Sequence, residues 1–159
     1  DPALITGVDP SQGMLAENRR HHPQVTLLEG TGEALPGADV SVDFVCMGYA
    51  LRHVEDLSKL FAEFKRVLKP GGRFLCLEFS TVDVAVLDKL YDFFSFNVIP
   101  GIGKLVAGDA EPYRYLVESI RRFPNQARFA AMITAAGFAR VTYRNLSGGI
   151  AAIHSGWKL

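Results

Sequence analysis

Several residues whose side chains or backbone could bind a ligand come directly after short apolar runs that we expect to be strands. They are Asp9, Thr31, Gly32 and Gly48. In open α/β sheets, ligands bind outside the carboxyl ends of the strands, so these positions are the first candidates for a binding site. A carboxylate held at a strand end, as expected for Asp9, can accept hydrogen bonds from both hydroxyls of a ribose. Alternatively, Asp9 caps the helix that follows it, and the other three are ordinary loop residues.

Arg52 and His53 follow the third of these apolar runs and are the candidates for catalysis. Histidine changes its charge near neutral pH, so His53 is a candidate general base. Arg52 carries a fixed set of donors that can hold an anionic oxygen. Alternatively, His53 is a solvated loop residue that caps the next helix, and Arg52 is a surface salt-bridge partner. Both interpretations of each residue stay open on the sequence.

Bringing these residues to one edge requires parallel strands that alternate with helices. Four apolar runs predict strands: 3–8, 25–28, 42–47 and 74–79. Helical spacing of apolar residues predicts helices over 14–21 and 57–68, and we expect Asp56 to cap the second one and Pro70-Gly71-Gly72 to end it. Unbroken apolar strands between amphipathic helices predict an α/β fold with a mostly parallel sheet.

The C-terminal half of the chain predicts more helix and then a hairpin. After an aromatic stretch over 87–99, apolar spacing predicts helices over 113–123 and 126–136. The last two strands, 138–145 and 150–157, are joined by a short link that contains two glycines, which is typical of an antiparallel hairpin.

Composition excludes several classes of function. Lys plus Arg and Asp plus Glu both number 17, so no net charge attracts the 159-residue chain to nucleic acid or to an anionic membrane. No apolar run approaches the roughly 20 residues that a membrane-spanning helix needs. We therefore predict a single soluble, intracellular domain whose membrane contact is at most peripheral. Cys46 and Cys76 lie in apolar runs and are expected to be buried, with no metal site. His21, His22 and His154 are expected to be surface or strand residues.

The most distinctive string runs from Arg66 to Ser80 and reads RVLKPGGRFLCLEFS. It combines a helix end, a tight turn and a buried strand. It resembles the second signature of the ubiquinone and menaquinone biosynthesis C-methyltransferase family, in which a helix, Lys-Pro-Gly-Gly and a strand ending in Glu-x-Ser follow in this order. The resemblance covers nearly the whole chain and continues through residues 90–92, 95–96, 98–100, 107–109, 113–124 and 150–159.

This resemblance implies a Rossmann-like class I methyltransferase fold with S-adenosylmethionine as cofactor. The implied reaction is C-methylation of a polyprenyl benzoquinol or naphthoquinol ring in ubiquinone or menaquinone biosynthesis, in which a ring carbon attacks the sulfonium methyl group. One alternative is a methyltransferase of the same fold that acts on another small molecule, since a fold does not fix a substrate. Another is a non-catalytic, truncated paralogue that acts through a protein-interaction surface.

The resemblance also assigns roles to individual residues. It makes Asp9 the ribose-binding acid, and it places Thr31 and Gly32 beside the adenine, where the family often has an amide or acid followed by alanine. Gly48 stands where some members have a serine that contacts the cofactor. Arg52-His53 stands where the family usually has Arg-Asn.

The aromatic stretch and the helix after it are expected to line an apolar slot for the quinol ring and its polyprenyl tail. Tyr91 and Tyr113 are the substrate-binding candidates of this slot. We expect one partial methyltransferase domain over 1–159, in which 81–124 form a helical insertion on the substrate side. The implied partners are the polyprenyl quinol and either a second copy or a complex of quinone-biosynthesis proteins. The implied location is the bacterial cytoplasm or the mitochondrial matrix beside the inner membrane.

Members of the family carry a first strand and a glycine-rich cofactor loop ahead of the strand that ends in the ribose acid. Neither is found in this sequence, which starts directly with the run that ends at Asp9. We therefore expect a gap in the sheet between the strands that end at Asp9 and Gly48, and no measurable methyltransferase activity from these 159 residues alone.

Overall fold

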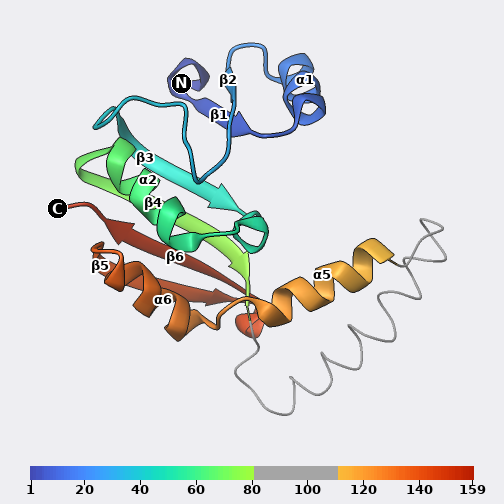
Figure 1. The fold of residues 1–159 in the computed structure, drawn as a ribbon, viewed down its shortest axis with the longest axis vertical. Helices are drawn as coiled ribbons and strands as arrows, with labels where there is room; N and C mark the ends of the chain where they lie inside the picture. The colour runs from blue at the N-terminus through green and yellow to red at the C-terminus, as the bar shows by residue number, and fades with distance from the viewer. Residues whose placement is uncertain (81–110) are drawn as a thin grey trace.

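The computed structural model describes residues 1–80 and 111–159 and, for residues 112–114, the backbone only. In chain order, its strands and α-helices are β1 (Thr6–Asp9), α1 (Gln12–His21), β2 (Thr26–Glu29), β3 (Val42–Gly48), α2 (Leu57–Val67), β4 (Leu68–Phe79), α5 (Glu111–Arg122), α6 (Gln126–Ala135), β5 (Ala139–Leu146) and β6 (Ala151–Trp157) (Figure 1). Short 3₁₀ helices are η1 (Pro2–Leu4), η2 (Leu51–His53) and η4 (Ser147–Gly149). Each element predicted within these ranges is present, with its ends shifted by a few residues.

The described strands form two separate sheets. Strands β1 and β2 form a parallel pair, and the other four lie in the order β3-β4-β6-β5. Strand β3 runs parallel to β4, whereas β6 runs antiparallel to both β4 and β5, as the predicted hairpin requires. Within the described residues no pairing joins β1 to β3, which confirms the expected gap between the strands that end at Asp9 and Gly48.

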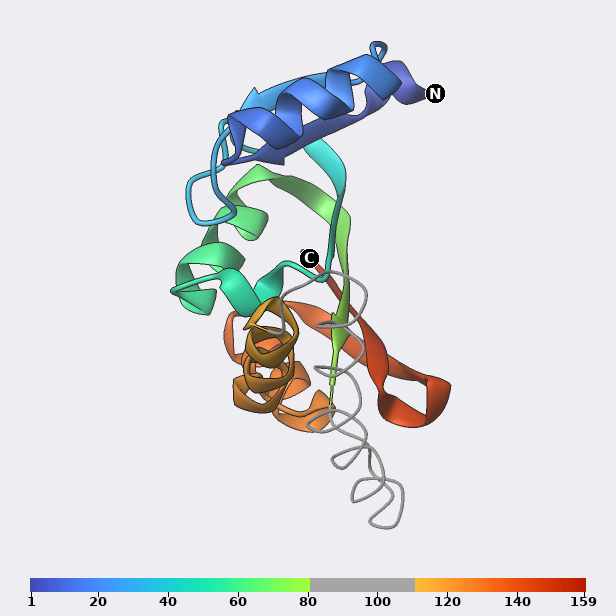
Figure 2. The same cartoon turned by 90° about the vertical axis from the view of Figure 1, so that its right-hand side faces the viewer.

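The hydrophobic core fills the space between the four-stranded sheet and helices α2 and α6. Figure 2 shows these two helices on the same side of the sheet. Aromatic rings dominate this core, because Phe61 packs against both Phe74 and Phe129 with centroid separations of 6.0 and 5.9 Å. Burying a side chain of this size stabilises the fold by about 1.5–3 kcal/mol. The core thus fixes α2, and with it the η2 segment that leads into α2.

Helix α2 also holds the loop that follows β2. The Arg66 guanidinium donates to the Leu35 and Gly37 carbonyl oxygens at 2.8 and 2.7 Å and pairs with Glu63 and Asp39. The hydrogen bond from Arg66 holds the pKa of the Glu63 carboxyl below its usual value, and the same pairing raises the pKa of Arg66. Because Glu63 also accepts from the Leu35 backbone N–H at 2.8 Å, the loop is tied to α2 at several points.

The structure corrects two predicted boundaries. Helix α2 ends at Val67, before the Pro70-Gly71-Gly72 turn, because Leu68 already has extended backbone angles and pairs with Val42 of β3. The run from residue 3 is strand only from Thr6, because Pro2–Leu4 form a 3₁₀ turn capped by the Asp1 side chain.

The burial of two single side chains also differs from expectation. Cys46 is exposed, since its side chain lies on the face of β3 opposite the core, whereas Cys76 is buried as predicted. His154 is a strand residue but is buried, with 2% of its surface exposed. No helix in the described ranges combines the length and apolar character needed to cross a membrane.

Candidate functional site

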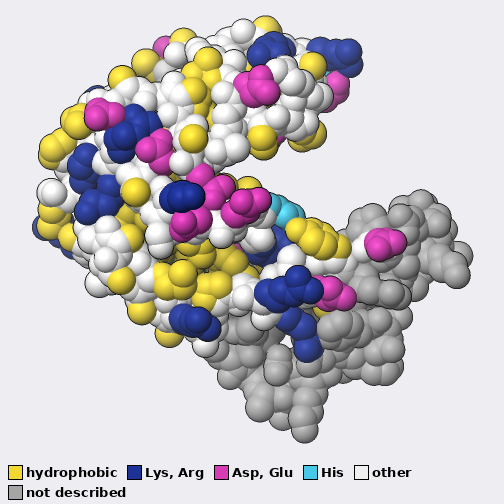
Figure 3. All heavy atoms as spheres, in the orientation of Figure 1, with side chains coloured by type: hydrophobic (Ala, Val, Ile, Leu, Met, Phe, Trp, Pro, Cys, Tyr) yellow, Lys and Arg dark blue, Asp and Glu magenta, His cyan; other side chains and the backbone are white. Residues whose placement is uncertain are grey.

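The candidate residues lie where strands β1 to β4 end. Figure 3 shows the molecule hollowed between the part formed by β1, α1 and β2 and the part formed by η2 and α5. The four strands are joined in two parallel pairs, Asp9 pairing with Glu29 and Gly48 with Leu77 at their carboxyl ends. This is the edge at which open α/β sheets bind ligands.

Asp9 is the last residue of β1 and is half-buried. Its Oδ1 atom accepts a hydrogen bond from the Ser11 backbone N–H at 2.7 Å. The N-cap of α1 is Ser11, whose Oγ accepts from Met14 N at 3.3 Å, so the alternative that Asp9 caps this helix is wrong. Because one oxygen of the carboxylate fixes the turn, the side chain is held in place and its second oxygen can serve a ligand.

Thr31 and Gly32 begin the loop that follows β2, next to Asp9. The Asp9 carbonyl oxygen accepts from Gly30 N at 3.3 Å, which places the two strand ends side by side. Gly32 packs so closely against α2 that an added Cβ would come within 2.4 Å of Leu60 Cδ1. Thr31 is exposed and forms a turn with Ala34, so its hydroxyl is accessible. The lack of a side chain at Gly32 therefore lets this loop pack closely against α2, while Thr31 stays accessible to solvent.

The chain turns sharply after Gly48, the last residue of β3. Among the described residues, no atom lies within 4 Å of a Cβ added at Gly48, so none of them fills the space beside this position. Tyr49 has a φ of 55°, a left-handed conformation that is rare for residues other than glycine. Its N–H donates to Leu77 O at 2.8 Å and its ring packs 4.6 Å from that of Phe79, and these contacts hold the unusual conformation. This turn directs the following residues, Arg52 among them, away from the sheet and toward α5.

The Arg52 side chain is 4% exposed and links η2 to both β4 and α5. Its Nε donates to Glu78 Oε1 at 2.7 Å, and its Nη1 donates to Ser119 Oγ at 2.9 Å. A third N–H donates to the Tyr49 carbonyl oxygen at 3.2 Å, and the guanidinium lies 5.1 Å from the centre of the Phe79 ring. Its partner Glu78 is also buried, so the alternative of a surface salt bridge for Arg52 is wrong. Three of its five N–H donors are bound within the chain.

His53 lies beside Arg52 but is exposed, and it contacts α5 one turn away. Its Nδ1 is 3.1 Å from the Tyr115 hydroxyl oxygen. The two rings are stacked, with centroids 5.8 Å apart and planes inclined by 18°. The next helix is capped by Asp56, whose Oδ1 accepts from the backbone N–H groups of Ser58 and Lys59, so the alternative that His53 caps it is wrong.

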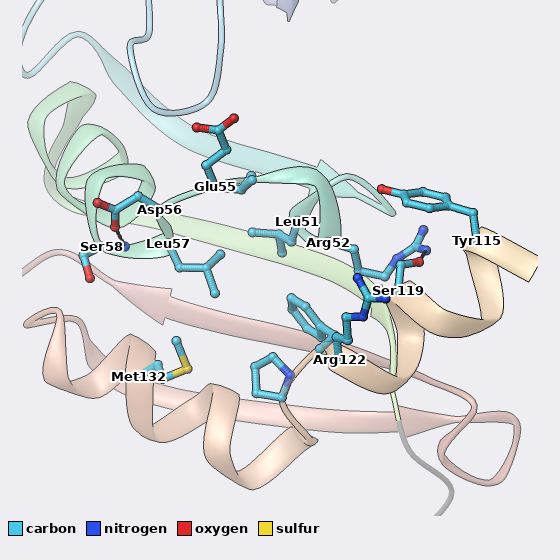
Figure 4. Close-up of a pocket in the computed structure, with 13 residues that line it drawn as sticks. Leu51, Arg52, Glu55, Asp56, Leu57, Ser58, Tyr115, Ser119, Arg122 and Met132 are labelled. Atoms are coloured by element: carbon cyan, nitrogen blue, oxygen red, sulfur yellow. Dashed lines mark hydrogen bonds between the residues drawn. The ribbon is translucent and has the colours of Figure 1, made fainter. Parts of the chain in front are cut away.

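A pocket of about 420 Å³ lies between η2, the start of α2, α5 and α6 (Figure 4). Its lining residues are Leu51, Arg52, Val54, Glu55, Asp56, Leu57, Ser58, Tyr115, Ser119, Arg122, Phe123, Pro124 and Met132. In Figure 4 Tyr115 extends from α5 toward the segment that carries Leu51 and Arg52. The lining mixes apolar side chains with several polar and charged ones, and the volume lies in the usual range for sites of small organic ligands.

The structure therefore brings Asp9 and the loop of Thr31 and Gly32 together, and it places Arg52 and His53 after the carboxyl end of β3. Tyr91 lies outside the described residues, and Tyr113 belongs to α5 without a described side chain.

The residues that sequence reasoning did not assign a role are Tyr115, Ser119 and Glu78. Tyr115 and Ser119 are four positions apart, so they lie on one face of a helix. Their spacing was the available signal, but nothing in the sequence indicated which surface this face meets.

Comparison with known proteins places the chain in a family. Residues 3–158 match the sequence pattern of the ubiE/COQ5 methyltransferase family. A Brucella anthropi protein named ubiquinone/menaquinone biosynthesis C-methyltransferase UbiE is 59% identical over 163 residues, which cover 99% of this chain and 62% of that protein. The protein of the same name from Methylobacterium nodulans is 54% identical over 160 residues, which cover 98% of this chain and 64% of that protein. The chain thus spans somewhat under two thirds of the length of these relatives.

Solved structures show the same fold. An S-adenosylmethionine-dependent methyltransferase from Thermotoga maritima superposes with a TM-score of 0.69 at 23% identity, over 98% of this chain and 73% of that one. A Haemonchus contortus phosphoethanolamine N-methyltransferase, solved with S-adenosyl-L-methionine, gives a TM-score of 0.67 at 16% identity, over 98% of this chain and 43% of that one. At these identities the likeness concerns the fold, which is the predicted Rossmann-like methyltransferase fold. Taken with the match over residues 3–158, it shows that the chain belongs to the ubiE/COQ5 methyltransferase family.

Proposed function

We propose that this chain is the larger part of an enzyme that transfers a methyl group from S-adenosylmethionine to a ring carbon of a polyprenyl benzoquinol or naphthoquinol. The observation that carries this proposal is that Asp9, the Gly32 loop, Gly48 and the Arg52-His53 pair all follow the carboxyl ends of strands in the two parallel pairs, β1 with β2 and β3 with β4. The names of the relatives from Brucella anthropi and Methylobacterium nodulans support the quinol as the methyl acceptor.

The residues at these strand ends fit the cofactor. The Asp9 carboxylate is held by Ser11 N and has a second oxygen for the hydroxyls of the ribose. We assign the adenine to the loop of Thr31 and Gly32, in which Gly32 packs closely against Leu60 and the exposed Thr31 offers a hydroxyl. None of the described residues fills the space beside Gly48, where a side chain would otherwise stand. When bound, S-adenosylmethionine supplies a methyl group that its positive sulfur already activates.

The chain's own residues would orient the acceptor ring and remove its proton. We assign proton removal to His53, which is exposed at the strand edge and contacts Tyr115. We assign to Arg52 the positioning of α5, because its donors bind Glu78, Ser119 and the Tyr49 carbonyl. The pocket between η2 and α5 has the volume to take a quinol ring, and Leu51, Leu57 and Phe123 supply an apolar part of its otherwise mixed lining. Holding ring and cofactor in line accounts for most of the rate in a transfer of this kind.

The acceptor's polyprenyl tail is strongly apolar and dissolves in a bilayer, so we propose that the enzyme meets its substrate at a membrane surface by peripheral contact. This surface would be that of the bacterial cytoplasmic membrane or, in an organelle, of the mitochondrial inner membrane on its matrix side. We also propose that the enzyme acts as a homodimer or in a complex with other quinone-biosynthesis proteins.

Cofactor binding tests the assignment of Asp9. In the intact gene product, we expect isothermal titration calorimetry to show that Asp9→Ala weakens S-adenosylmethionine binding by about 1.5–3 kcal/mol, the range for hydrogen bonds to charged groups. The matched control is Asp43→Ala, which removes an exposed carboxylate that pairs with Lys69 at 2.9 Å. Equal affinities for Asp9→Ala and Asp43→Ala would contradict the assignment of Asp9 to the ribose.

A further inference from the structure

Two consecutive residues of η2 contact two residues that lie one turn apart on α5. Arg52 Nη1 donates to Ser119 Oγ at 2.9 Å, and His53 Nδ1 lies 3.1 Å from Tyr115 Oη. Ser119 Oγ in turn donates to the Leu116 carbonyl oxygen at 2.8 Å, so its lone pairs face Arg52. Two contacts therefore join η2 to α5. Two hydrogen bonds, one of them from Arg52, hold the Ser119 hydroxyl in place, and His53 contacts Tyr115.

The contact between Ser119 and Arg52 determines where Tyr115 lies. Arg52 is buried and anchored to Glu78, which belongs to the central strand β4 and is 1% exposed. Since residues four apart on a helix lie on the same face, fixing Ser119 against Arg52 places Tyr115 over His53. The stacked rings, 18° from parallel, restrict the imidazole further. His53 is thus an exposed histidine whose ring plane and Nδ1 partner are both determined by the fold.

We propose that Tyr115 is a positioning residue that sets the tautomer of His53. In this arrangement Nδ1 carries the proton of the neutral imidazole and donates it to Tyr115 Oη, which leaves the lone pair of Nε2 free. Within the described residues no hydrogen bond involves His53 Nε2, so this is the nitrogen open to a ligand. Tyr115 is 53% exposed, and its own hydroxyl hydrogen can bond to water while its oxygen accepts from Nδ1. The proposal rests on the proposed function, in which His53 is the base.

The proton balance follows from this tautomer. The hydroxyl proton of the quinol passes to Nε2, and the electron pair of the broken O–H bond stays on the quinol oxygen, which enriches the ring carbon that attacks the methyl group. The sulfur keeps the electron pair of the broken S–C bond. The ring carbon then loses its own hydrogen as a proton to water, which restores the aromatic ring, and the quinol oxygen takes back the proton held on Nε2. The His53 imidazolium retains its Nδ1–H bond to Tyr115 Oη throughout. With the opposite tautomer Nε2 would carry a hydrogen and could not accept the proton.

Nitrogen-15 NMR of the protein tests the tautomer without any need for activity, because protonated and unprotonated imidazole nitrogens differ widely in chemical shift. We expect His53, identified by the loss of its signals in His53→Asn, to be mainly protonated at Nδ1 above the pH at which it becomes neutral. In Tyr115→Phe the stacked ring stays but the acceptor is gone, and His53 should shift to the Nε2–H form that free histidine favours in water. Tyr143→Phe, which alters another exposed tyrosine on β5, is the matched control and should leave the His53 signals unchanged.

A His53 that is mainly Nε2–H in the parent protein, or the same tautomer in the parent and in Tyr115→Phe, would overturn the proposal. Turnover gives the second readout in the intact gene product. We expect Tyr115→Phe to lower kcat by about 10-fold to 100-fold, a part of the usual contribution of a general base, with an unchanged KM for S-adenosylmethionine. Unchanged kcat would also overturn the proposal. Absence of methyl transfer in the parent enzyme would refute the proposed function instead, and the NMR result would still report on the tautomer.

Discussion

At the scale of single residues, three side chains at the strand ends differ in burial and in how many of their polar atoms are already hydrogen-bonded. Asp9 is held through one oxygen, Arg52 is buried with three donors bound, and His53 is exposed with one nitrogen bound. A group that must exchange protons with a substrate needs an accessible atom, and a group that positions a helix needs bound ones. The difference in exposure supports the proposed roles, in which His53 takes up a proton and Arg52 positions α5.

Replacement of the base should affect turnover far more than binding. We expect His53→Asn to lower kcat by about 10²-fold or more while the affinity for S-adenosylmethionine stays nearly unchanged, because a general base acts on the transition state. Asparagine is the informative replacement because it is the residue that the family usually carries at this position. A fully active His53→Asn enzyme would show that the proton leaves by another route.

The two cysteines should differ in reactivity. Burial raises the pKa of the Cys76 thiol well above its usual value, and Cys46 is exposed on β3. Since the thiolate is the reactive form, we expect a maleimide to modify one cysteine in the native protein and two after denaturation. Mass spectrometry of the parent and of Cys46→Ala checks this. Native modification of Cys46→Ala would contradict the described burial.

Sequence reasoning reached the strand-edge residues but not their partners. Asp9, Gly32, Gly48, Arg52 and His53 could be proposed because each follows an apolar run that reads as a strand. Their partners on α5 could not, because a contact between residues more than 60 positions apart depends on how a helix packs. Local patterns carry no information on that packing.

At the scale of elements, the buried pair of Arg52 and Glu78 joins η2, β4 and α5. Each partner alone would be a buried charge, and removing one partner of such a pair usually costs about 3–5 kcal/mol. The Oε2 atom of Glu78 and the Ser80 hydroxyl have no hydrogen-bond partner within the described residues. The end of β4 thus already holds buried polar atoms without partners, and removing Arg52 would add the unpaired charge of Glu78 to them.

A double-mutant cycle tests this link. We expect Arg52→Met to lower the free energy of unfolding by about 3 kcal/mol or more, and the double variant Arg52→Met/Glu78→Gln to recover a large part of the loss. The control is Lys69→Met, which breaks the exposed Lys69–Asp43 pair and should cost less than about 1 kcal/mol. Strictly additive losses from the two substitutions, measured by urea denaturation, would show that Arg52 and Glu78 do not stabilise each other.

The helices and strands were mostly predicted correctly because the residue patterns that indicate them are local. The predictions were wrong where strand pairing or packing decides the outcome. The Lys-Pro-Gly-Gly turn was expected to end α2, but β4 begins at Leu68 because that residue pairs with Val42 of β3. Cys46 was expected to be buried because its run is apolar. A continuous apolar run does not reveal that one face of β3 lacks a covering element within the described residues.

At the scale of the whole molecule, the two sheets are connected by the loop between β2 and β3, which Arg66 and Glu63 hold against α2. The gap between them could be predicted, because the strand that the family places there is not in this sequence. The burial of His154 could not be predicted, because it depends on how β6 packs against α6. The His154 Nε2 donates to the Gln126 carbonyl oxygen at 3.0 Å, and its buried Nδ1 has no hydrogen-bond partner in the part of the chain that the structure describes.

This buried histidine should make stability depend on pH. Burial lowers the pKa of His154, so the folded chain keeps the ring neutral while the unfolded chain takes up a proton near the usual histidine pKa. The stabilisation is therefore present above that pKa and is lost as the pH falls, by at most about 1.4 kcal/mol per pH unit between about pH 7 and pH 5.5.

Urea denaturation across this range measures the slope. We expect His154→Gln to flatten the slope, because glutamine does not titrate and its amide can still donate to the Gln126 carbonyl oxygen. His22→Gln, which changes an exposed histidine, should keep the slope of the parent protein. Parallel slopes for the parent protein and His154→Gln would show that His154 is not the titrating group.

The intact gene product is expected to methylate a quinol ring at carbon. The most direct measurement incubates that product with S-adenosylmethionine bearing a labelled methyl group and with polyprenyl benzoquinols and naphthoquinols that lack a ring methyl, and then locates the label by mass spectrometry and NMR. We expect the label on a ring carbon, in an amount that falls when Asp9 or His53 is replaced. Label on a quinol oxygen, or none on any quinol while S-adenosylmethionine binds, would contradict the account.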